Sequence, residues 1–273
     1  MLEHAVIPVD IHRRFDDTMA MAAFLEYFTT RRVCLVHIDS GRDRNKTTRI
    51  LDDRRQQLAG LGLQTELVLR RGHIATAVVE AASAVGGDFI CIPWKRKGML
   101  KRSLLGSTTM DIIRMSDIPV FVFKKPGLAH DGSRLNRVLY ATGFAKTDSR
   151  VVPYLTSSGL KAEHLTLLHV GQRAPDPVAE QERLARVNKN LDRLANECAP
   201  FFSSITSKEV IGTPRRQIVL QARILKTDLI VVGTFDSSDS LDQVLGSTAQ
   251  AITYSTPCPV LTVPGIKTPG DAG

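Results

Sequence analysis

The chain has 273 residues, of which 43% are hydrophobic and 23% are charged, and its formal net charge is +8. This composition is typical of a soluble globular protein with one large domain or two of ordinary size. It argues against a membrane-spanning helix, because no apolar run approaches about 18 residues, and the first residues do not form a secretory leader. The positive charge permits attraction to nucleic acid, anionic lipid or phosphate, but it selects none of them.

Short apolar runs alternate along the chain with longer segments of helical period. In the first half the pattern predicts strands at 5–9, 33–38, 65–70, 88–92 and 119–123, and helices at about 15–29, 46–60, 74–85 and 107–115. In the second half it predicts strands near 137–141, 164–170, 204–210, 228–232 and 259–263. This alternation predicts the α/β class, with a parallel, doubly wound sheet covered by helices on both faces.

The second half of the chain repeats the first. The segment from Gly72 aligns without a gap with the segment from Gly212, at an offset of 140 residues. Further upstream, residues 6–10 match 138–142 at an offset of 132, so the second copy has 140 − 132 = 8 more residues between its second and third strands. The sequence therefore predicts two tandem domains, each a five-stranded parallel sheet with four helices. We place them at 1–126 and 134–266, with a linker at 127–133 and a flexible tail at 267–273.

A basic loop follows the fourth predicted strand of the first copy. It contains five cations, Lys95, Arg96, Lys97, Lys101 and Arg102. The loop ends in Gly-Ser-Thr at 106–108, and the second copy has the same triplet at 246–248. Doubly wound sheets bind ligands beyond the carboxyl ends of their strands, and a Gly-Ser at a helix start directs free N–H groups toward an anion. Thr108 with Asp111, and Ser247 with Gln250, also have the spacing of a helix capping box.

These residues resemble the universal stress protein family in its tandem, two-domain form, over essentially the whole chain. The resemblance rests on Asp10 after the first strand, the LVHID of 35–39, the GHIATAVVEAA that begins at Gly72, and the Gly-Ser-Thr followed by an Ile-Pro-Val strand. In nucleotide-binding members the fourth strand leads into G-x-x-G, nine residues, and G-[ST]. The resemblance implies a stress-response protein, and the leading hypothesis is a regulatory role with no dedicated catalytic activity.

Both copies depart from the family's nucleotide motif. Pro93 and Arg96 stand at the two loop glycines in the first copy, and Gly233 and Asp236 stand there in the second. A carboxylate at 236 would repel phosphates. We therefore rank the first copy above the second as a nucleotide site and expect overall ATP affinity to be about millimolar or absent. The candidate ligand-binding residues are Val9, Asp10, Ile38, Arg96, Gly106, Ser107, Thr108, Thr142, Val170, Gly233, Asp236, Gly246, Ser247 and Thr248.

Three functions remain open at this point. The first is regulation through an unknown small molecule or protein partner, with degenerate nucleotide pockets. The second is ATP binding, with slow hydrolysis, by the first copy. The third is contact with nucleic acid or an anionic surface through 95–102, although only Trp94 supplies an aromatic ring there. A solvated loop is the ordinary alternative to all three.

The sequence contains no catalytic or metal-binding motif that we can identify. His37 and His169, which occupy equivalent strand ends, are expected to be hydrogen-bonded structural residues rather than general bases. The cysteines are scattered, and Cys34, Cys91 and Cys258 lie in or beside apolar runs. Buried thiols in a reducing cytoplasm are the simplest interpretation.

The family resemblance also implies how the two domains meet. It pairs them through their fifth strands, which here are the apolar segments 118–124 and 258–264. Exposed apolar sheet edges are avoided in natural proteins. We therefore expect an intrachain pseudo-dimer through these strands, and assembly into a true homodimer remains open.

Overall fold

A computed structural model of the chain describes residues 1–12, 14–39, 44–94, 107–124, 135–144, 147–157, 159–234 and 247–265. The chain divides into two compact units, residues 1–125 and 126–273. The linker expected at 127–133 and the tail expected at 267–273 lie outside the described residues. The pairing of 118–124 with 258–264 stays a prediction.

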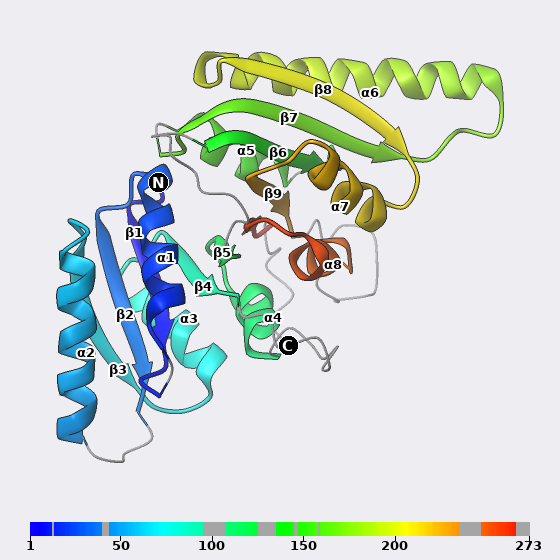
Figure 1. Cartoon of the computed structure of the whole chain (residues 1–273). Helices are drawn as coiled ribbons and strands as arrows, with labels where there is room; N and C mark the ends of the chain where they lie inside the picture. Colours follow the sequence, from blue (N-terminus) through cyan, green and yellow to red (C-terminus); the bar gives the residue numbers. More distant parts are fainter. Residues whose placement is uncertain are drawn as a thin grey trace. The chain divides into compact units, whose positions relative to one another are not determined.

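The first unit is a five-stranded parallel sheet with two layers of helices (Figure 1). Its strands are β1 (His4–Val9), β2 (Arg32–Ile38), β3 (Gln64–Arg70), β4 (Phe89–Pro93) and β5 (Val120–Phe123), in the spatial order β3-β2-β1-β4-β5. Its helices are α1 (Asp16–Phe24), a 3-10 turn at Leu25–Phe28, α2 (Arg44–Ala59), α3 (Ile74–Ala84) and α4 (Ser107–Met115). Helix α1 contacts α2 and helix α3 contacts α4, as expected for a sheet covered on both faces.

The second unit has the same topology. Its strands are β6 (Leu135–Thr142), β7 (Ala162–Gly171), β8 (Ser204–Ile211), β9 (Leu229–Gly233) and β10 (Val260–Val263), in the order β8-β7-β6-β9-β10. Its helices are α5 (Asp148–Thr156), α6 (Pro177–Cys198), a 3-10 turn at Ala199–Phe201, α7 (Pro214–Ile224) and α8 (Ser247–Ser255). Helix α5 contacts α6, and α7 contacts α8. The predicted α/β class, parallel sheets and tandem repeat are confirmed.

The extra residues of the second copy mostly lengthen one helix. Helix α6 has 22 residues, whereas its counterpart α2 has 16. Six of the eight additional residues therefore extend α6 along β7 and β8, as Figure 1 shows. Asp176 caps α6, because its Oδ1 accepts a hydrogen bond of 2.9 Å from the N–H of Ala179. The insertion thus leaves the strand order of the sheet unchanged.

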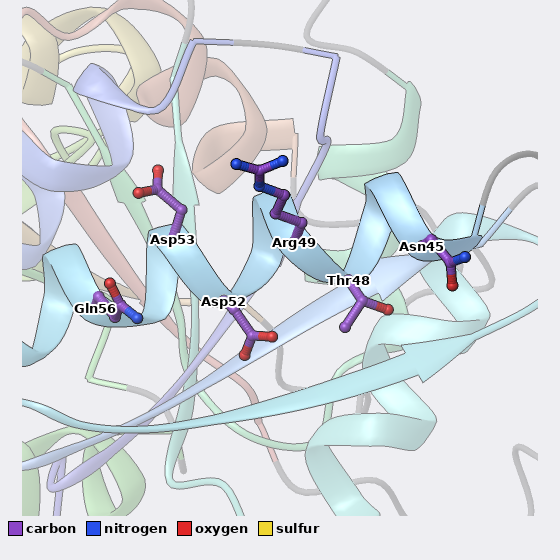
Figure 2. A pocket seen from close by; sticks show the side chains of 6 residues that line it. All are labelled: Asn45, Thr48, Arg49, Asp52, Asp53 and Gln56. Carbon is purple, nitrogen blue, oxygen red and sulfur yellow. The ribbon is translucent and has the colours of Figure 1, made fainter.

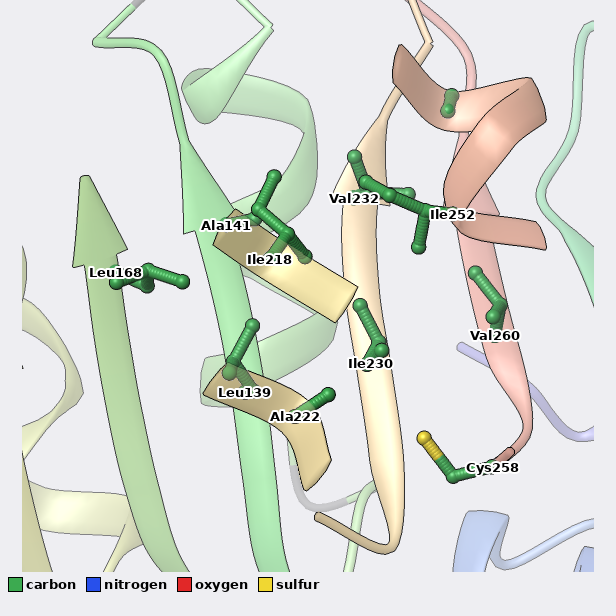
Figure 3. Close-up of a cluster of buried hydrophobic side chains, with 11 residues drawn as sticks. Leu139, Ala141, Leu168, Ile218, Ala222, Ile230, Val232, Ile252, Cys258 and Val260 are labelled. Carbon is green, nitrogen blue, oxygen red and sulfur yellow. The ribbon is translucent and has the colours of Figure 1, made fainter. Parts of the chain in front are cut away.

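The packing of each unit follows from the position of its strands. Strand β1 lies between two neighbours and is apolar and buried along most of its length, whereas the edge strand β3 is only partly buried. In the first unit, Phe24, Phe28 and Phe121 pack with ring centroids 4.9 to 5.8 Å apart. In the second unit an aliphatic core fills the space beneath α7 and α8, and Figure 3 shows Leu139, Ile230 and other members of it.

Each unit also contains buried cysteines. Cys34, Cys91, Cys198 and Cys258 are all buried and free, which confirms the expectation for the three cysteines in apolar runs. Burial raises the pKa of the Cys34 thiol to about 12 and that of the Cys198 thiol to about 11. At neutral pH these thiols remain protonated, and protonated thiols are poor nucleophiles.

An equivalent aspartate holds the start of the central strand in each unit. Asp88 precedes β4 and its Oδ2 accepts hydrogen bonds from the N–H groups of Glu3 at 2.9 Å and His4 at 3.1 Å. Asp228 precedes β9 and does the same for Asn136 at 2.9 Å and Arg137 at 2.8 Å. Because the two aspartates are equivalent in the repeat, the duplicated sequence has kept this link between the central strand and its later neighbour.

None of the helices within the described ranges is long and apolar enough to cross a membrane.

Candidate functional site

A cavity of about 290 Å³ lies at the carboxyl ends of β6, β7 and β9. The strand order of the second unit reverses between β6 and β9, and open α/β sheets bind ligands at this point. The starts of α5, α7 and α8 complete the walls, through residues such as Asp148, Pro214 and Thr248. The cavity is therefore built by the elements that the fold class assigns to ligand binding.

The side chains that form the floor of the cavity also belong to the aliphatic core beneath it. Ala141, Leu168, Ile218, Val232 and Ala249 line the cavity and also belong to the core cluster. Figure 3 labels the first four of them around the ends of the strands. A floor of this kind is rigid and apolar, because its side chains are already packed from below. It offers an apolar surface to the body of a ligand.

One wall of the cavity holds a buried carboxylate. Asp148, at the start of α5, is only 6% exposed. It accepts hydrogen bonds from the phenol of Tyr140 and from the Thr142 hydroxyl, the latter at 2.9 Å to Oδ2. Burial, together with the charge and the hydrogen bond of Asp148, raises the pKa of Tyr140 above its ordinary value. The phenol therefore remains a donor, and two hydroxyl donors favour the ionised form of the carboxyl group.

The Thr142 hydroxyl has a second partner. Its oxygen accepts a hydrogen bond of 2.9 Å from the N–H of Phe144, which has a left-handed φ of 59°. In the first unit the equivalent turn is closed by a carboxylate, because Asp10 Oδ1 accepts from the N–H of His12 at 3.0 Å. Both are turns stabilised by a side chain that bonds two residues ahead. The replacement of Asp10 by Thr142 keeps the turn and leaves the hydroxyl proton free to bond Asp148.

The two strand-end histidines have the structural role expected of them. His37 Nδ1 lies 3.0 Å from the carbonyl oxygen of Val9, and His169 Nδ1 lies 3.1 Å from that of Thr142. A carbonyl oxygen only accepts hydrogen bonds, so Nδ1 carries the proton in both rings. The ring of His169 also stacks on Phe144, with centroids 4.3 Å apart. These contacts fix the loop that follows β6 at the cavity rim.

Gly233 is required by packing at the end of β9. A Cβ atom built there would lie 2.4 Å from Cγ2 of Thr147 and 3.2 Å from its Cβ. The sequence assigned this glycine to close approach of a phosphate, but the space above it contains the Thr147 side chain, which is buried. Gly233 therefore lets helix α5 come close to β9 and gives the cavity less access to the backbone than the sequence suggested.

The helix starts that carry the Gly-Ser-Thr triplets differ in one respect from the sequence prediction. Helices α4 and α8 begin at Ser107 and Ser247, so Thr108 lies within the first turn of its helix and not at the cap. Its expected partner Asp111 forms an ion pair with Arg114 instead. The capping box predicted for Thr108 and Asp111 is therefore wrong. Thr248 lines the cavity.

The first unit arranges its candidate residues differently. Val9 ends β1 and is 8% exposed, and Ile38 ends β2 and is half-buried. Asp10 is exposed. The guanidinium of Arg54 donates to the carbonyl oxygens of Asp10 at 3.0 Å and Ile11 at 3.2 Å. Burial lowers the pKa of Arg54 from its ordinary value, and the charge of Asp10 opposes that shift. A cation from α2 thus holds the turn after β1.

A second hollow, of about 520 Å³, lies along α2. Figure 2 shows that its six polar side chains, from Asn45 to Gln56, all come from this one helix. Several of them already have partners, since Asp53 accepts from Gln57 at 2.8 Å and Asp52 pairs with Arg55 at 3.2 Å. A site that discriminates among ligands needs groups from several elements that converge. This hollow is therefore a solvated helix surface.

The structure brings four of the sequence candidates together. Thr142, Val170, Gly233 and Thr248 line the cavity of the second unit. Arg96, Gly106, Asp236 and Gly246, together with the basic segment 95–102, lie outside the described residues. Across the described ranges, no three His, Cys, Asp or Glu side chains gather as metal ligands would.

Sequence reasoning missed three residues of the site, Tyr140, Thr147 and Asp148. A signal for Asp148 was present, because the second copy loses an aspartate at 142 but has another six residues later. The first copy also has an aspartate at that later position, Asp16. Its carboxylate is exposed and pairs with Arg14 at 2.6 Å. Only the structure distinguishes the buried member of this pair from the exposed one.

Comparison with known proteins identifies a family for this chain. The family model described as the universal stress protein family matches residues 35–124 and 135–264. A universal stress protein from Archaeoglobus fulgidus is similar in structure, with a TM-score of 0.67, 18% identity, and coverage of 97% of this chain and 97% of that chain. A universal stress protein from Pseudomonas aeruginosa has a TM-score of 0.65 and 17% identity, over 96% of this chain and 93% of that one.

A third structure, a universal stress protein in complex with cAMP, covers 48% of this chain and 97% of that chain, with 21% identity and a TM-score of 0.37. No curated protein sequence matches. The identities of the structural neighbours support the fold alone, whereas the family model matches both halves and most of the chain. The chain therefore belongs to the universal stress protein family and carries two copies of the family's domain in tandem.

Proposed function

We propose that the protein is a non-catalytic universal stress protein that acts by binding a small molecule, and that its working site is the cavity of the second unit. The observation that carries the proposal is the position of this cavity. It lies at the strand switch point, with an apolar floor and a few polar groups that converge on one wall. This combination is the usual form of a small-molecule site in an open α/β sheet.

The residues at the cavity support binding rather than catalysis. His169 is held by the carbonyl oxygen of Thr142 and by the ring of Phe144. Asp148 is engaged by Tyr140 and Thr142. A catalytic base needs a substrate proton within reach and a nucleophile or water held nearby. Here the titratable groups are used to hold the wall in place, and a fixed wall favours selective binding.

This proposal places the site in the opposite half to the one that the sequence ranked first. The ranking rested on Asp10 and on the basic loop after β4. Asp10 closes an exposed turn, and the loop cations lie outside the described residues. The cavity of the second unit has a floor, walls and buried polar groups, so it is the stronger candidate for a ligand of limited size.

A retained ligand is the first test. Freshly purified protein is denatured, and the released small molecules are identified by mass spectrometry. We expect a molecule that the Thr248→Trp variant does not retain, because the new ring fills the cavity. Thr108→Trp is the matched control, since Thr108 is the equivalent residue of the first unit, and it should retain the molecule. Retention by Thr248→Trp and loss by Thr108→Trp would place the site in the first unit and reject the proposal.

A further inference from the structure

We infer that the outer face of helix α7, in the second unit, is a docking surface for an anionic lipid bilayer. Four exposed side chains form this outer face: Arg216, Leu220, Arg223 and Ile224. Lys226 follows directly after the helix and is also exposed. The surface is separate from the cavity, because the cavity is lined by the buried side of α7, through Ile218.

The spacing of the four residues places them on one side of the helix. Positions i, i+4, i+7 and i+8 share a face of an α-helix. The opposite side is buried, and Figure 3 labels Ile218 and Ala222 of that side among the core side chains. On the outer face Leu220 is 49% exposed and Ile224 is 60% exposed. Because side chains four residues apart are neighbours on a helix, the face presents two adjacent aliphatic side chains beside guanidinium groups.

The charge of this segment is positive throughout. Between Thr213 and Lys226 the sequence has four cations and no aspartate or glutamate. The cations are all exposed: Arg215, Arg216, Arg223 and Lys226. In the part of the chain that the structure describes, none of the four forms an ion pair. A surface of this kind is complementary to an anionic partner.

Several of these residues stand where they do not stabilise the helix. Arg215 and Arg216 lie in the first turn, where the helix dipole disfavours cations. Lys226 has a left-handed φ of 50°, which glycine adopts without strain and lysine does not. The exposed parts of the two aliphatic side chains gain nothing from burial in the folded unit. Residues that break local rules together in this way are expected at functional sites.

The equivalent helix of the first unit, α3, has different residues at all of these positions. At the offset of 140, the four residues of the outer face are replaced by Thr76, Glu80, Ser83 and Ala84. Gly86 stands in place of Lys226 and has a φ of 62°. Segment 73–86 contains one glutamate and no lysine or arginine. Since both helices pack on their sheets, the fold does not require the cations and exposed aliphatic side chains of α7.

The residue types of the surface favour a bilayer over a protein or a nucleic acid. Protein interfaces are enriched in tyrosine and tryptophan and depleted in lysine, and single-stranded nucleic acid stacks on aromatic rings. Between Thr213 and Lys226 the sequence has no aromatic residue, and it combines aliphatic side chains with arginine and lysine, as interfacial helices do. Because the inner side of α7 is fixed in the core, only its outer side chains can enter the headgroup region. Binding should therefore be shallow and reversible.

The test is co-sedimentation of the full chain with lipid vesicles at about 0.1 M salt. One set of vesicles contains phosphatidylcholine alone, and the other also contains about 30% phosphatidylserine. We expect the protein to bind the anionic vesicles at least about tenfold more tightly than the neutral ones. Most of this binding should be lost at about 0.5 M salt. Equal binding to both sets, or none to the anionic set, would overturn the inference.

Variants that give α7 the residues of α3 locate the surface. Arg216→Thr with Arg223→Ser should weaken binding to anionic vesicles by about twentyfold, since each cation near an anionic surface contributes about fivefold. Arg31→Ser with Arg32→Thr is the matched control, because it removes two exposed cations from the first unit. It should change binding by less than about threefold. Leu220→Glu should weaken binding by at least about tenfold. Equal losses in the control and in the arginine variant of α7 would mean that net charge alone decides, and would overturn the inference.

Lys226→Gly separates lipid binding from folding. Glycine relieves the left-handed strain, so this variant should unfold at a temperature at least as high as that of the unchanged chain. It should nevertheless bind anionic vesicles about fivefold more weakly. A purely structural lysine would not show this opposite response. Unchanged vesicle binding, in this variant and in Arg216→Thr with Arg223→Ser, would overturn the inference.

An acidic peptide tests the competing class of partner. Polyglutamate takes the place of the vesicles in a titration of the full chain at the same salt concentration. Binding of polyglutamate that depends on Arg216 and Arg223, without vesicle binding, would assign the surface to an acidic protein and overturn the inference. Vesicle binding that the α7 variants weaken and Thr248→Trp leaves unchanged would support it, whatever the retained-ligand experiment shows for the cavity.

Discussion

The turns after β1 and β6 occupy equivalent places in the two halves but are stabilised by different side chains. In the first unit Asp10 and Asp16 are both exposed, and the buried Arg54 holds the turn by donating to two of its carbonyl oxygens. In the second unit Thr142 takes the place of Asp10, and Asp148, the counterpart of Asp16, is buried. The first copy thus leaves both aspartates in solvent and buries a guanidinium, whereas the second copy buries an aspartate in the wall of a cavity.

The differences between the turns are linked by the need to satisfy the buried carboxylate. Tyr140 and Thr142 are its two hydroxyl donors, and their counterparts in the first unit are Pro8 and Asp10. Neither counterpart has a side-chain donor at neutral pH. A buried carboxylate without donors is strongly destabilising. The comparison therefore teaches that equivalent positions of a duplicated domain change together. Burial of the Asp148 carboxylate requires hydrogen-bond donors at the neighbouring positions, which Tyr140 and Thr142 supply.

The largest expected effect comes from removal of the buried carboxylate. Asp148→Ala leaves two buried hydroxyl groups without their acceptor and should lower the free energy of unfolding by about 3 kcal/mol. Asp16→Ala removes an exposed ion pair and should cost less than about 1 kcal/mol. Urea unfolding followed by circular dichroism measures both. Equal losses would show that the two turns do not differ in the way described.

The next effect concerns the contact between β9 and α5. Gly233→Ala forces a methyl group against Thr147 Cγ2, at 2.4 Å in the present geometry, and should cost about 1–3 kcal/mol. Gly143→Ala is the control, because a Cβ there meets no atom within 4 Å, and it should change stability by less than about 0.5 kcal/mol. Thermal or urea unfolding of the two variants measures both changes in stability. A neutral Gly233→Ala would mean that α5 moves away from β9 without cost.

Tyr140 should make the second unit sensitive to high pH. Its pKa is raised in the folded protein by burial and by Asp148, so its stabilising contribution is complete below the unfolded pKa of about 10. That contribution is lost as the pH rises above this value toward the folded pKa, because only the unfolded chain ionises. Tyr140→Phe should remove the alkaline loss and cost about 1–2 kcal/mol at neutral pH. Unfolding measured at intervals from pH 8 to pH 11 tests this, and an unchanged alkaline slope in Tyr140→Phe would contradict it.

A fourth experiment tests the part of the comparison in which the halves should agree. Asp88→Ala and Asp228→Ala each remove an acceptor from two backbone N–H groups at the edge of solvent. Each should cost about 1 kcal/mol, and the two losses should be equal within error. Hydrogen exchange of the first residues of β1 and β6 locates the effect. A large difference between the variants would show that the link has diverged as well.

The smallest expected effect is an acid sensitivity of the second unit. Glu180 has its pKa lowered to about 2 by the hydrogen bond from Arg183 and by the N–H of Ala174. Its contribution is therefore present above the ordinary pKa of a glutamate and is lost as the pH falls toward 2. Glu180→Gln should flatten this part of the stability curve. The first unit offers a control in Thr48→Gln, in the first part of α2, which should leave the curve unchanged.

The sequence predicted the strands within about two residues because apolar runs and turns mark them directly. The offsets of 132 and 140 also exposed the repeat, which supplied the second half of the topology from the first. The candidate site was predicted less well. Thr142, Val170, Gly233 and Thr248 were found from their place in the motif, but Tyr140 and Asp148 were not.

The reason for this gap is that burial is a tertiary property. Asp16 and Asp148 both stand in the first turn of an equivalent helix, and local sequence gives both the role of an acidic helix start. What separates them is the side chain that the neighbouring strand presents, Pro8 in one half and Tyr140 in the other. Gly233 shows the same limit, since only coordinates reveal that Thr147 fills the space above it.

The hydrogen bonds accepted by Asp88 and Asp228 affect the order in which strands can pair while the chain is being synthesised. They join the start of each central strand to residues 85 and 92 positions later. During synthesis the central strand must therefore wait for most of its own domain to emerge before its second neighbour can pair with it. Contacts so distant in sequence slow folding and leave apolar strands uncovered in the meantime. Because each half contains its own link, the first unit can form its link before the second unit has been synthesised.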